Sequence, residues 1–233
     1  MIRTIAFDAD DTLWHNERYF RLTQTRFGEL LADFAESDDL QSQLLAAEKR
    51  NLGRYGFGVK GFVLSMIETA VEVTEGRVPG HIIGELIACG QDMLAAPIEV
   101  LPDIQATLET LAQDHQLMVI TKGDLLDQER KVAQSGLGDL FDGVEVVADK
   151  SPQIYVRIFS AFEGGTEHAL MVGNSLRSDV LPALEAGSWA IHVPHDLTWE
   201  YEQAETPDTH PKFREIKNFG ALPDLIPTLR HQT

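Results

Sequence analysis

The chain has 233 residues and a formal net charge of −18, because 37 acidic side chains outnumber 19 basic ones. Nucleic-acid binders and proteins bound to anionic membranes depend on clustered Lys and Arg, so neither class is expected. The single cysteine, Cys89, excludes an intrachain disulfide and an all-cysteine metal site. Without a long apolar run or a signal-like N-terminus, the sequence predicts a globular cytoplasmic protein. A monomer or a homodimer is expected.

The first predicted element is a short buried strand. Residues 2–7 are mostly apolar and run directly into an acidic cluster that contains Asp8, Asp10 and Asp11. Such a run is typical of a parallel strand that carries polar side chains at its carboxyl end.

Residues 17–96 have a different pattern. Apolar side chains recur at helical spacing in three segments, with a weaker fourth helix over residues 40–52, and no strand is predicted. Between the second and third helices, residues 53–61 are rich in glycine and predict a mobile loop that carries Arg54 and Lys60. The stretch therefore predicts a helical bundle.

From residue 97 onward, helices and short apolar strands alternate. The strands are expected at residues 117–120, 144–147, 169–172 and 189–193, and the helices at 103–114, 125–135, 152–162 and 179–186. This alternation predicts an α/β fold with a doubly wound, Rossmann-like parallel sheet. The expected domains are a core of residues 1–16 and 97–233 and an inserted helical domain of residues 17–96.

Polar side chains follow four of the expected strands, and the carboxyl ends of parallel strands meet at one edge of a sheet. Carboxylates there can bind Mg²⁺, and a free carboxylate can attack phosphorus. A second carboxyl two residues on can act as general acid and base, while a hydroxyl and an ammonium stabilise charge on the transferring group. The pattern favours a magnesium-assisted phosphoryl transfer that uses these four groups: Asp8, Asp10, Thr121 and Lys150.

These segments resemble the four motifs of the haloacid dehalogenase-type hydrolases, most of which are phosphatases. The motifs stand in order over essentially the whole chain: Asp8-Ala9-Asp10-Asp11-Thr12, Val119-Ile120-Thr121, Lys150 before Ser151-Pro152, and Gly173-Asn174 through Asp179. The helical stretch is similar to the cap domain that members of that superfamily carry after the first strand.

The resemblance implies a role for each matched residue. Asp8 would be the nucleophile and a metal ligand, and Asp10 the general acid/base, with its backbone carbonyl on Mg²⁺. Thr121 and Lys150 would bind the phosphoryl group, and Asp179 would be a metal ligand or would anchor one. The implied protein is a Mg²⁺-dependent phosphatase of a small phosphorylated metabolite.

One position departs from the motif and leaves alternatives open. The fourth motif usually begins Gly-Asp, whereas this chain has Asn174, whose amide oxygen can bind Mg²⁺ but adds no charge. Either Asp179 takes over as the charged ligand, or the metal is held more weakly. The dehalogenases of the superfamily need no metal and have changed this motif too, so a 2-haloacid dehalogenase that attacks carbon with Asp8 stays an alternative, as does a non-catalytic ligand-binding relative. Asp10 opposes the dehalogenase, because an alkoxide leaving group needs a proton and a halide does not.

Substrate recognition is expected from residues outside the motifs. Lys122 follows Thr121, His15 follows the first motif, and Arg54 and Lys60 lie on the glycine-rich segment. His192 near the end of the last expected strand, and His195 and Trp199 after it, suggest a metal site at first sight. No third His or Cys is placed in sequence to complete one, so packing or surface roles are favoured.

Overall fold

The computed structural model describes residues 1–229, which divide into two compact units. The first contains Met1–His15, Ile98–Lys122 and the chain from Gln128 onward, and the second contains Asn16–Pro97 with Gly123–Asp127. None of the helices described is long and apolar enough to span a membrane.

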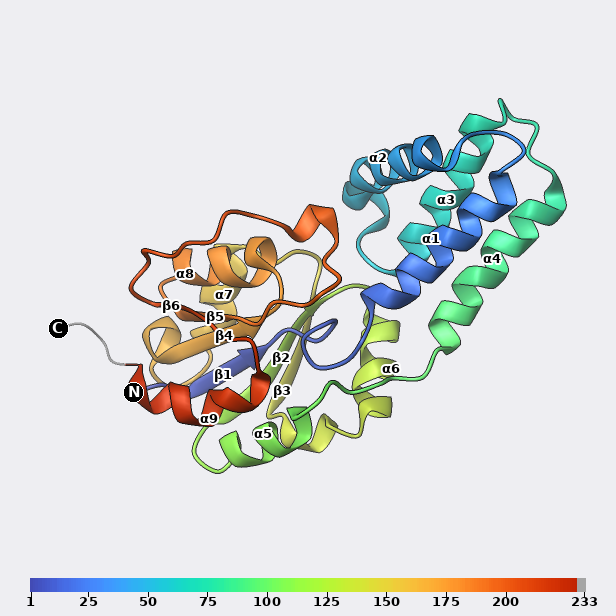
Figure 1. The fold of residues 1–233 in the computed structure, drawn as a ribbon. Coiled ribbons are helices and arrows are strands. Elements are labelled where there is room, and N and C mark those ends of the chain that lie inside the picture. The colour runs from blue at the N-terminus through green and yellow to red at the C-terminus, as the bar shows by residue number, and fades with distance from the viewer. Residues whose placement is uncertain (230–233) are drawn as a thin grey trace. The chain divides into compact units, whose positions relative to one another are not determined.

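The first unit is built on a parallel sheet of six strands in the order β3-β2-β1-β4-β5-β6 (Figure 1). The strands are β1 (Thr4–Phe7), β2 (Gln116–Lys122), β3 (Gly143–Val147), β4 (Ala169–Gly173), β5 (Trp189–His192) and β6 (Phe213–Glu215). The strand order reverses between β1 and β4, and ligands of doubly wound sheets bind beside such a switch point. The α/β, doubly wound fold class is confirmed.

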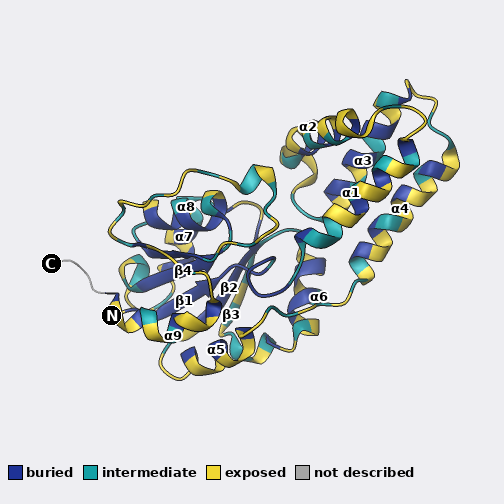
Figure 2. Cartoon of the chain, in the orientation of Figure 1, coloured by how far each residue is buried: buried dark blue, intermediate teal, exposed yellow. Residues whose placement is uncertain are grey.

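Helices cover both faces of this sheet (Figure 1). They are α5 (Ile104–Leu111), α6 (Leu125–Ser135), α7 (Pro152–Phe159), α8 (Leu181–Glu185) and α9 (Leu222–Leu225). Along β1, Ile5 and Phe7 face the cluster that includes α5 and α9, whereas Ala6 faces the cluster that includes α7 and α8. All four β1 residues are therefore buried, as the strand's apolar sequence predicts (Figure 2).

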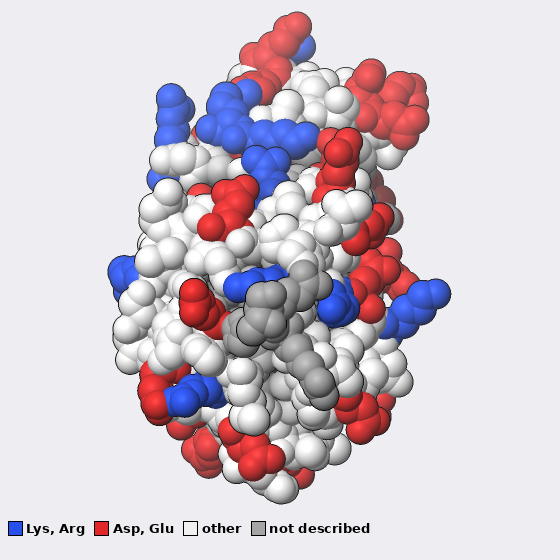
Figure 3. Space-filling model, turned by 90° about the vertical axis from the view of Figure 1, so that its left-hand side faces the viewer, with Lys and Arg blue, Asp and Glu red and all other residues white. Residues whose placement is uncertain are grey.

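The second unit contains four helices around their own apolar core. They are α1 (Glu17–Leu31), α2 (Ser37–Tyr55), α3 (Val59–Val73) and α4 (Gly80–Ala95). The expectation of an inserted helical bundle is confirmed. On the face drawn in Figure 3, several Lys and Arg side chains gather in one group in the upper part of the view, and acidic side chains lie in separate groups around and below it.

Two local expectations are wrong, and one strand was missed. The segment 53–61 is not one mobile loop, because α2 continues to Tyr55 and α3 begins at Val59. Gly61 serves close packing there, since a Cβ would lie 2.8 Å from the Gly56 carbonyl oxygen. The three-residue strand β6 was not expected, and the expected helix 179–186 is a π turn at Leu176–Val180 followed by α8.

Candidate functional site

The sheet order explains how segments far apart in sequence come together. β1 lies between β2 and β4, with Phe7 in register with both Val119 and Val172. Asp8 follows directly and donates its backbone N–H to the Val172 carbonyl at 2.9 Å. Thr121 lies buried near the end of β2, so the first, second and fourth motifs occupy neighbouring strand ends.

Lys150 is the centre of a buried charge cluster. Its ammonium donates to Asp8 Oδ1 at 2.5 Å and to Asp179 Oδ1 at 2.7 Å. Burial raises the pKa of Asp8 to about 7, Asp179 and Asp10 add to the rise, and Lys150 opposes it. Burial alone would lower the pKa of Lys150, but the two carboxylates hold it above its usual value. Lys150 therefore stays charged, and burial makes Asp8 easier to protonate than an exposed aspartate.

Asp179 is placed by the π turn that follows β4. Its Oδ2 accepts the Ser175 backbone N–H at 2.9 Å, while the Ser175 hydroxyl caps the turn by accepting from the Ser178 N–H. A Cβ on Gly173 would lie 2.2 Å from Asp179 Oδ2, so the carboxylate packs against the bare Cα of this glycine. Gly173 thus creates the space that the buried carboxylate fills.

Oxygen donors for a hard cation converge between β1 and β4. The Thr12 hydroxyl lies 3.1 Å from Asp8 Oδ2 and 3.2 Å from Asn174 Oδ1. Asp8 and Asp179 in turn share the Lys150 ammonium. Carboxylate and amide oxygens are ligands that Mg²⁺ accepts, so the donor set fits a magnesium ion, with Asn174 supplying an oxygen without a charge.

Asp10 faces a different set of partners. Its carboxylate accepts from Lys131 at 2.9 and 3.0 Å, from Gln128 at 2.9 Å and from the Trp14 indole at 2.8 Å. Burial would raise the pKa of Asp10, but the charge of Lys131 and these hydrogen bonds outweigh it and lower the pKa below its usual value. In the resting protein Asp10 is therefore a carboxylate, held by residues of α6 and of the turn after β1.

Lys122 belongs to a second polar cluster. Its ammonium donates to Glu202 Oε1 at 2.6 Å and to the Ser178 hydroxyl at 2.7 Å. Glu202 Oε2 accepts from the hydroxyls of Ser175 and Ser178, each at 2.5 Å. Burial would raise the pKa of Glu202, but Lys122 and the serine hydroxyls lower it. The segment after β5 is thereby tied to the turn that carries Asp179.

The remaining expected substrate residues lie in two places. His15 is partly buried in the sheet unit, where its ring lies edge-on to that of His195. Arg54 is exposed near the end of α2, and Lys60 pairs with Asp124 at 2.9 Å, both within the helical unit. Recognition of substrate by His15, Arg54 and Lys60 stays a prediction.

Sequence reasoning missed several residues that hold the site together. Thr12 is part of the first motif, so its spacing could have suggested a role beside Asp8. Gln128, Lys131 and Glu202 carry no such signal, because Gln128 and Lys131 lie 118 and 121 positions from Asp10, and Glu202 lies 80 positions from Lys122. Only the packing of α6 and of the segment after β5 brings them to the site.

Comparison with known proteins places these motifs in a family. The sequence profile of the haloacid dehalogenase-like hydrolases matches residues 2–187. A glyceraldehyde 3-phosphate phosphatase of Methanothermobacter thermautotrophicus is 25% identical over 85% of this chain and 88% of its own length. One of the same name from Methanocaldococcus jannaschii is 23% identical over 99% of both chains.

A solved structure gives the same result for the fold. A haloacid dehalogenase-like hydrolase from Xanthomonas campestris is 40% identical and superposes with a TM-score of 0.88. The alignment covers 98% of this chain and 91% of that one. The chain described here therefore belongs to the haloacid dehalogenase-like hydrolase family.

Proposed function

We propose that the protein is a Mg²⁺-dependent phosphatase that hydrolyses a small phosphorylated metabolite through an aspartyl-phosphate on Asp8. The observation that carries the proposal is the buried Lys150, which binds both Asp8 and Asp179. A buried lysine between two carboxylates positions a nucleophile beside a group that attracts an anion. The relatives' names make a triose phosphate the first substrate class to test.

In the first half-reaction, a carboxylate oxygen of Asp8 attacks phosphorus, and the bond to the leaving oxygen breaks. Asp10 gives that oxygen its proton and becomes a carboxylate. The resting Asp10 is ionised, but the approach of an anionic substrate raises the pKa of a nearby carboxylate, which favours protonation before this step. Thr121 and Lys150 bind the non-bridging oxygens of the transferring group.

In the second half-reaction, Asp10 takes a proton from water, and the resulting hydroxide attacks the phosphorus of the aspartyl-phosphate. Inorganic phosphate leaves and the Asp8 carboxylate is restored. Asp8, Asn174, Asp179 and the Asp10 backbone carbonyl would hold the metal ion. When bound, Mg²⁺ would supply positive charge that offsets the charge of the phosphoryl group.

The helical unit would act as a cap on the site. The proposed cap domain comprises residues 17–96. Within it, Arg54 and Lys60 would recognise the part of the substrate beyond its phosphate. Lys122 and His15 would contribute from the sheet unit. A cap that excludes water protects the aspartyl-phosphate from uncontrolled hydrolysis and strengthens the electrostatic contacts inside.

A metal-free 2-haloacid dehalogenase is the second candidate, because Asn174 lowers the charge of the metal site. One experiment separates the two functions. Phosphate release is measured on a panel of triose, sugar and nucleoside phosphates with Mg²⁺ and with EDTA, and chloride release from 2-chloropropionate is measured without metal. The proposal expects phosphate release that EDTA abolishes; chloride release without phosphate release would overturn it.

A further inference from the structure

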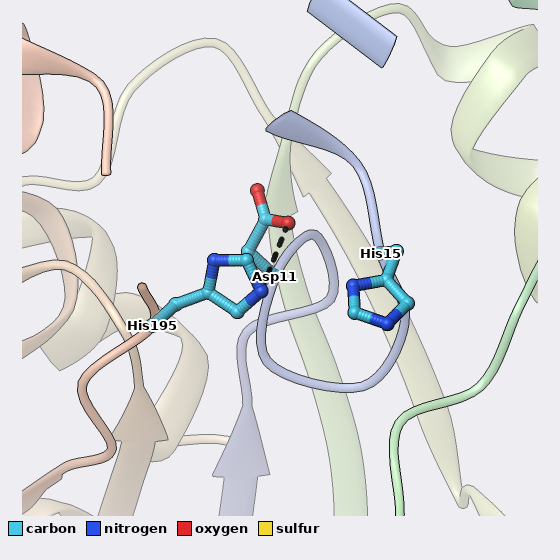
Figure 4. Close-up of side chains that lie close together, drawn as sticks. All are labelled: Asp11, His15 and His195. Atoms are coloured by element: carbon cyan, nitrogen blue, oxygen red, sulfur yellow. Dashed lines mark ion pairs between the residues drawn. The ribbon is translucent and has the colours of Figure 1, made fainter. Parts of the chain in front are cut away.

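A cluster of two histidines and a carboxylate lies beside the first motif, within the sheet unit. Asp11, His15 and His195 each offer one ligand atom, and the three atoms lie within 4.8 Å of one another (Figure 4). The Nε2 of His195 is 3.7 Å from Asp11 Oδ1, and the two imidazole rings are 5.8 Å apart, edge to face. Asp11 is buried and both histidines are partly buried, so the cluster is shielded from bulk water.

The local backbone fixes two of these residues. Asp11 has a φ of 60°, in the left-handed region, and donates its N–H to the Trp14 carbonyl at 2.8 Å. The His15 N–H is bonded to the Glu99 carbonyl at 3.0 Å. The turn that carries Asp11 and His15 is therefore held at both ends, and these bonds fix the backbone positions from which the two side chains extend.

The third residue arrives from the segment after β5. His195 Nδ1 lies 2.8 Å from the Leu197 carbonyl oxygen and 3.2 Å from the Leu197 backbone nitrogen. When Nδ1 donates to the carbonyl oxygen, which is the shorter of these contacts, Nε2 carries a lone pair and faces the Asp11 carboxylate. Histidines that bind metals characteristically donate their other ring N–H to a carbonyl or carboxylate in this way.

The separation of Nε2 and the Asp11 carboxylate suits two ligands of one cation. The distance of 3.7 Å is too long for a hydrogen bond from Nε2 to Asp11. Two ligands at about 2.0–2.1 Å from a tetrahedral zinc ion lie about 3.4 Å apart, close to the separation seen here. A divalent cation can accept a lone pair from each of the two imidazoles and from the carboxylate at once, so one ion would use all three converging atoms.

We propose that Asp11, His15 and His195 form a second metal site that binds a borderline divalent cation of the zinc class. Two imidazole nitrogens and one carboxylate oxygen suit Zn²⁺ or Co²⁺, whereas Mg²⁺ prefers an all-oxygen set. Three protein ligands leave a fourth position for water. The site would join the turn after β1 to the segment after β5, and it uses none of the residues assigned to Mg²⁺.

The test is a Co²⁺ and Zn²⁺ titration of the metal-stripped full chain in millimolar Mg²⁺, read by calorimetry and by the visible absorption of Co²⁺. We expect one ion per chain in wild type, with the visible bands of tetrahedral Co²⁺. His15→Ala and His195→Ala should each weaken binding by at least about tenfold. The exposed His81→Ala is the matched control and should bind as wild type does.

Asp8→Asn separates this site from the magnesium site and should also bind as wild type does. Circular dichroism establishes that each variant is folded, and His195→Gln repeats the test with a larger side chain if His195→Ala is not. The proposal is overturned if wild type binds neither ion, if either His15→Ala or His195→Ala binds unchanged, or if Asp8→Asn abolishes binding.

Discussion

The two units of the molecule use charged side chains in different ways. In the sheet unit, Lys150 is 1% exposed and lies between two carboxylates. In the helical unit, Arg50 also lies between two carboxylates, Glu68 and Glu72, but its side chain is 46% exposed. Solvent screens the second arrangement and leaves the first at nearly full strength. Of these two arrangements, the buried one lies where strand ends converge, at the site that we propose for catalysis.

The largest effect is expected from Asp8→Asn. Without the nucleophile, turnover of a phosphate ester should fall by at least about a thousandfold. Asp38→Asn, an exposed carboxylate in the first turn of α2, is the control and should keep full activity. Retention of most of the activity in Asp8→Asn would remove the basis for covalent catalysis.

Asp8→Asn should lower the activity but raise the stability of the fold. The pKa of Asp8 is raised in the folded state, so between its usual value and about pH 7 the folded chain binds more protons than the unfolded chain. The free energy of unfolding therefore falls as the pH rises through this window. An asparagine side chain cannot ionise, so the Asp8→Asn variant should not lose this part of the free energy. In metal-free buffer at pH 8, Asp8→Asn should melt at a higher temperature than wild type; a lower melting temperature contradicts this account of the charge cluster.

Lys150→Met tests the contrast between buried and exposed charges directly. It leaves Asp8 and Asp179 buried without their cation, which should lower the free energy of unfolding by about 3–5 kcal/mol. Arg50→Met removes the matched cation of the helical unit and should change that free energy by less than about 1 kcal/mol. Urea denaturation of both variants measures the difference, and equal losses would mean that burial does not distinguish the two clusters.

Gly173→Ala probes the space that Asp179 fills. A Cβ would lie 2.2 Å from the carboxylate, so Asp179 must move away from Lys150. We expect Mg²⁺ affinity and activity both to fall by about tenfold or more, because a displaced ligand weakens the metal site. Gly84→Ala is the control in α4, where a Cβ meets nothing within 4 Å and should stabilise the helix by about 0.5–1 kcal/mol. Unchanged magnesium affinity in Gly173→Ala would exclude Asp179 as a ligand.

The smallest effect is a shift in the pH profile. Lys131 lowers the pKa of Asp10, and burial opposes it, so Lys131→Met should raise that pKa. Where Asp10 acts as a base, the loss of activity on the acid side of the profile should begin at a higher pH. Where Asp10 acts as an acid, it should stay protonated, and the enzyme active, up to a higher pH. The whole profile of kcat/KM should therefore move to higher pH. The exposed Lys49→Met should leave the profile in place, and a profile unchanged in Lys131→Met would place Asp10 outside the proton transfers.

The sequence predicts the sheet and its motif-bearing ends well, because each buried strand is a short apolar run that ends in polar residues. Asp8, Thr121, Asn174 and Lys150 follow from that pattern alone. β6 could not be predicted, because it has only three residues, two of them exposed, and so shows no alternation of apolar and polar side chains. The glycines of residues 53–61 mislead because Gly53 and Gly61 lie within α2 and α3, and only residues 56–58 join the two helices.

Long-range partners of the site could not be predicted in the same way. Lys131 lies on a helix that the sequence does predict, but its bond to Asp10 depends on how α6 packs against the turn after β1. His195 shows the same limit, since the residues beside it in space, Asp11 and His15, are about 180 positions away in the chain. Spacing along the sequence indicates a metal site only when its ligands are local.

The most direct test of the proposed catalysis is to trap the phosphoenzyme. Enzyme turning over a phosphate ester with Mg²⁺ is quenched in acid, digested and analysed by mass spectrometry. We expect one phosphoryl group on the peptide that carries Asp8, released by hydroxylamine as acyl phosphates are, and none on Asp8→Asn. Phosphate release by the wild-type enzyme with no adduct on that peptide would contradict the account.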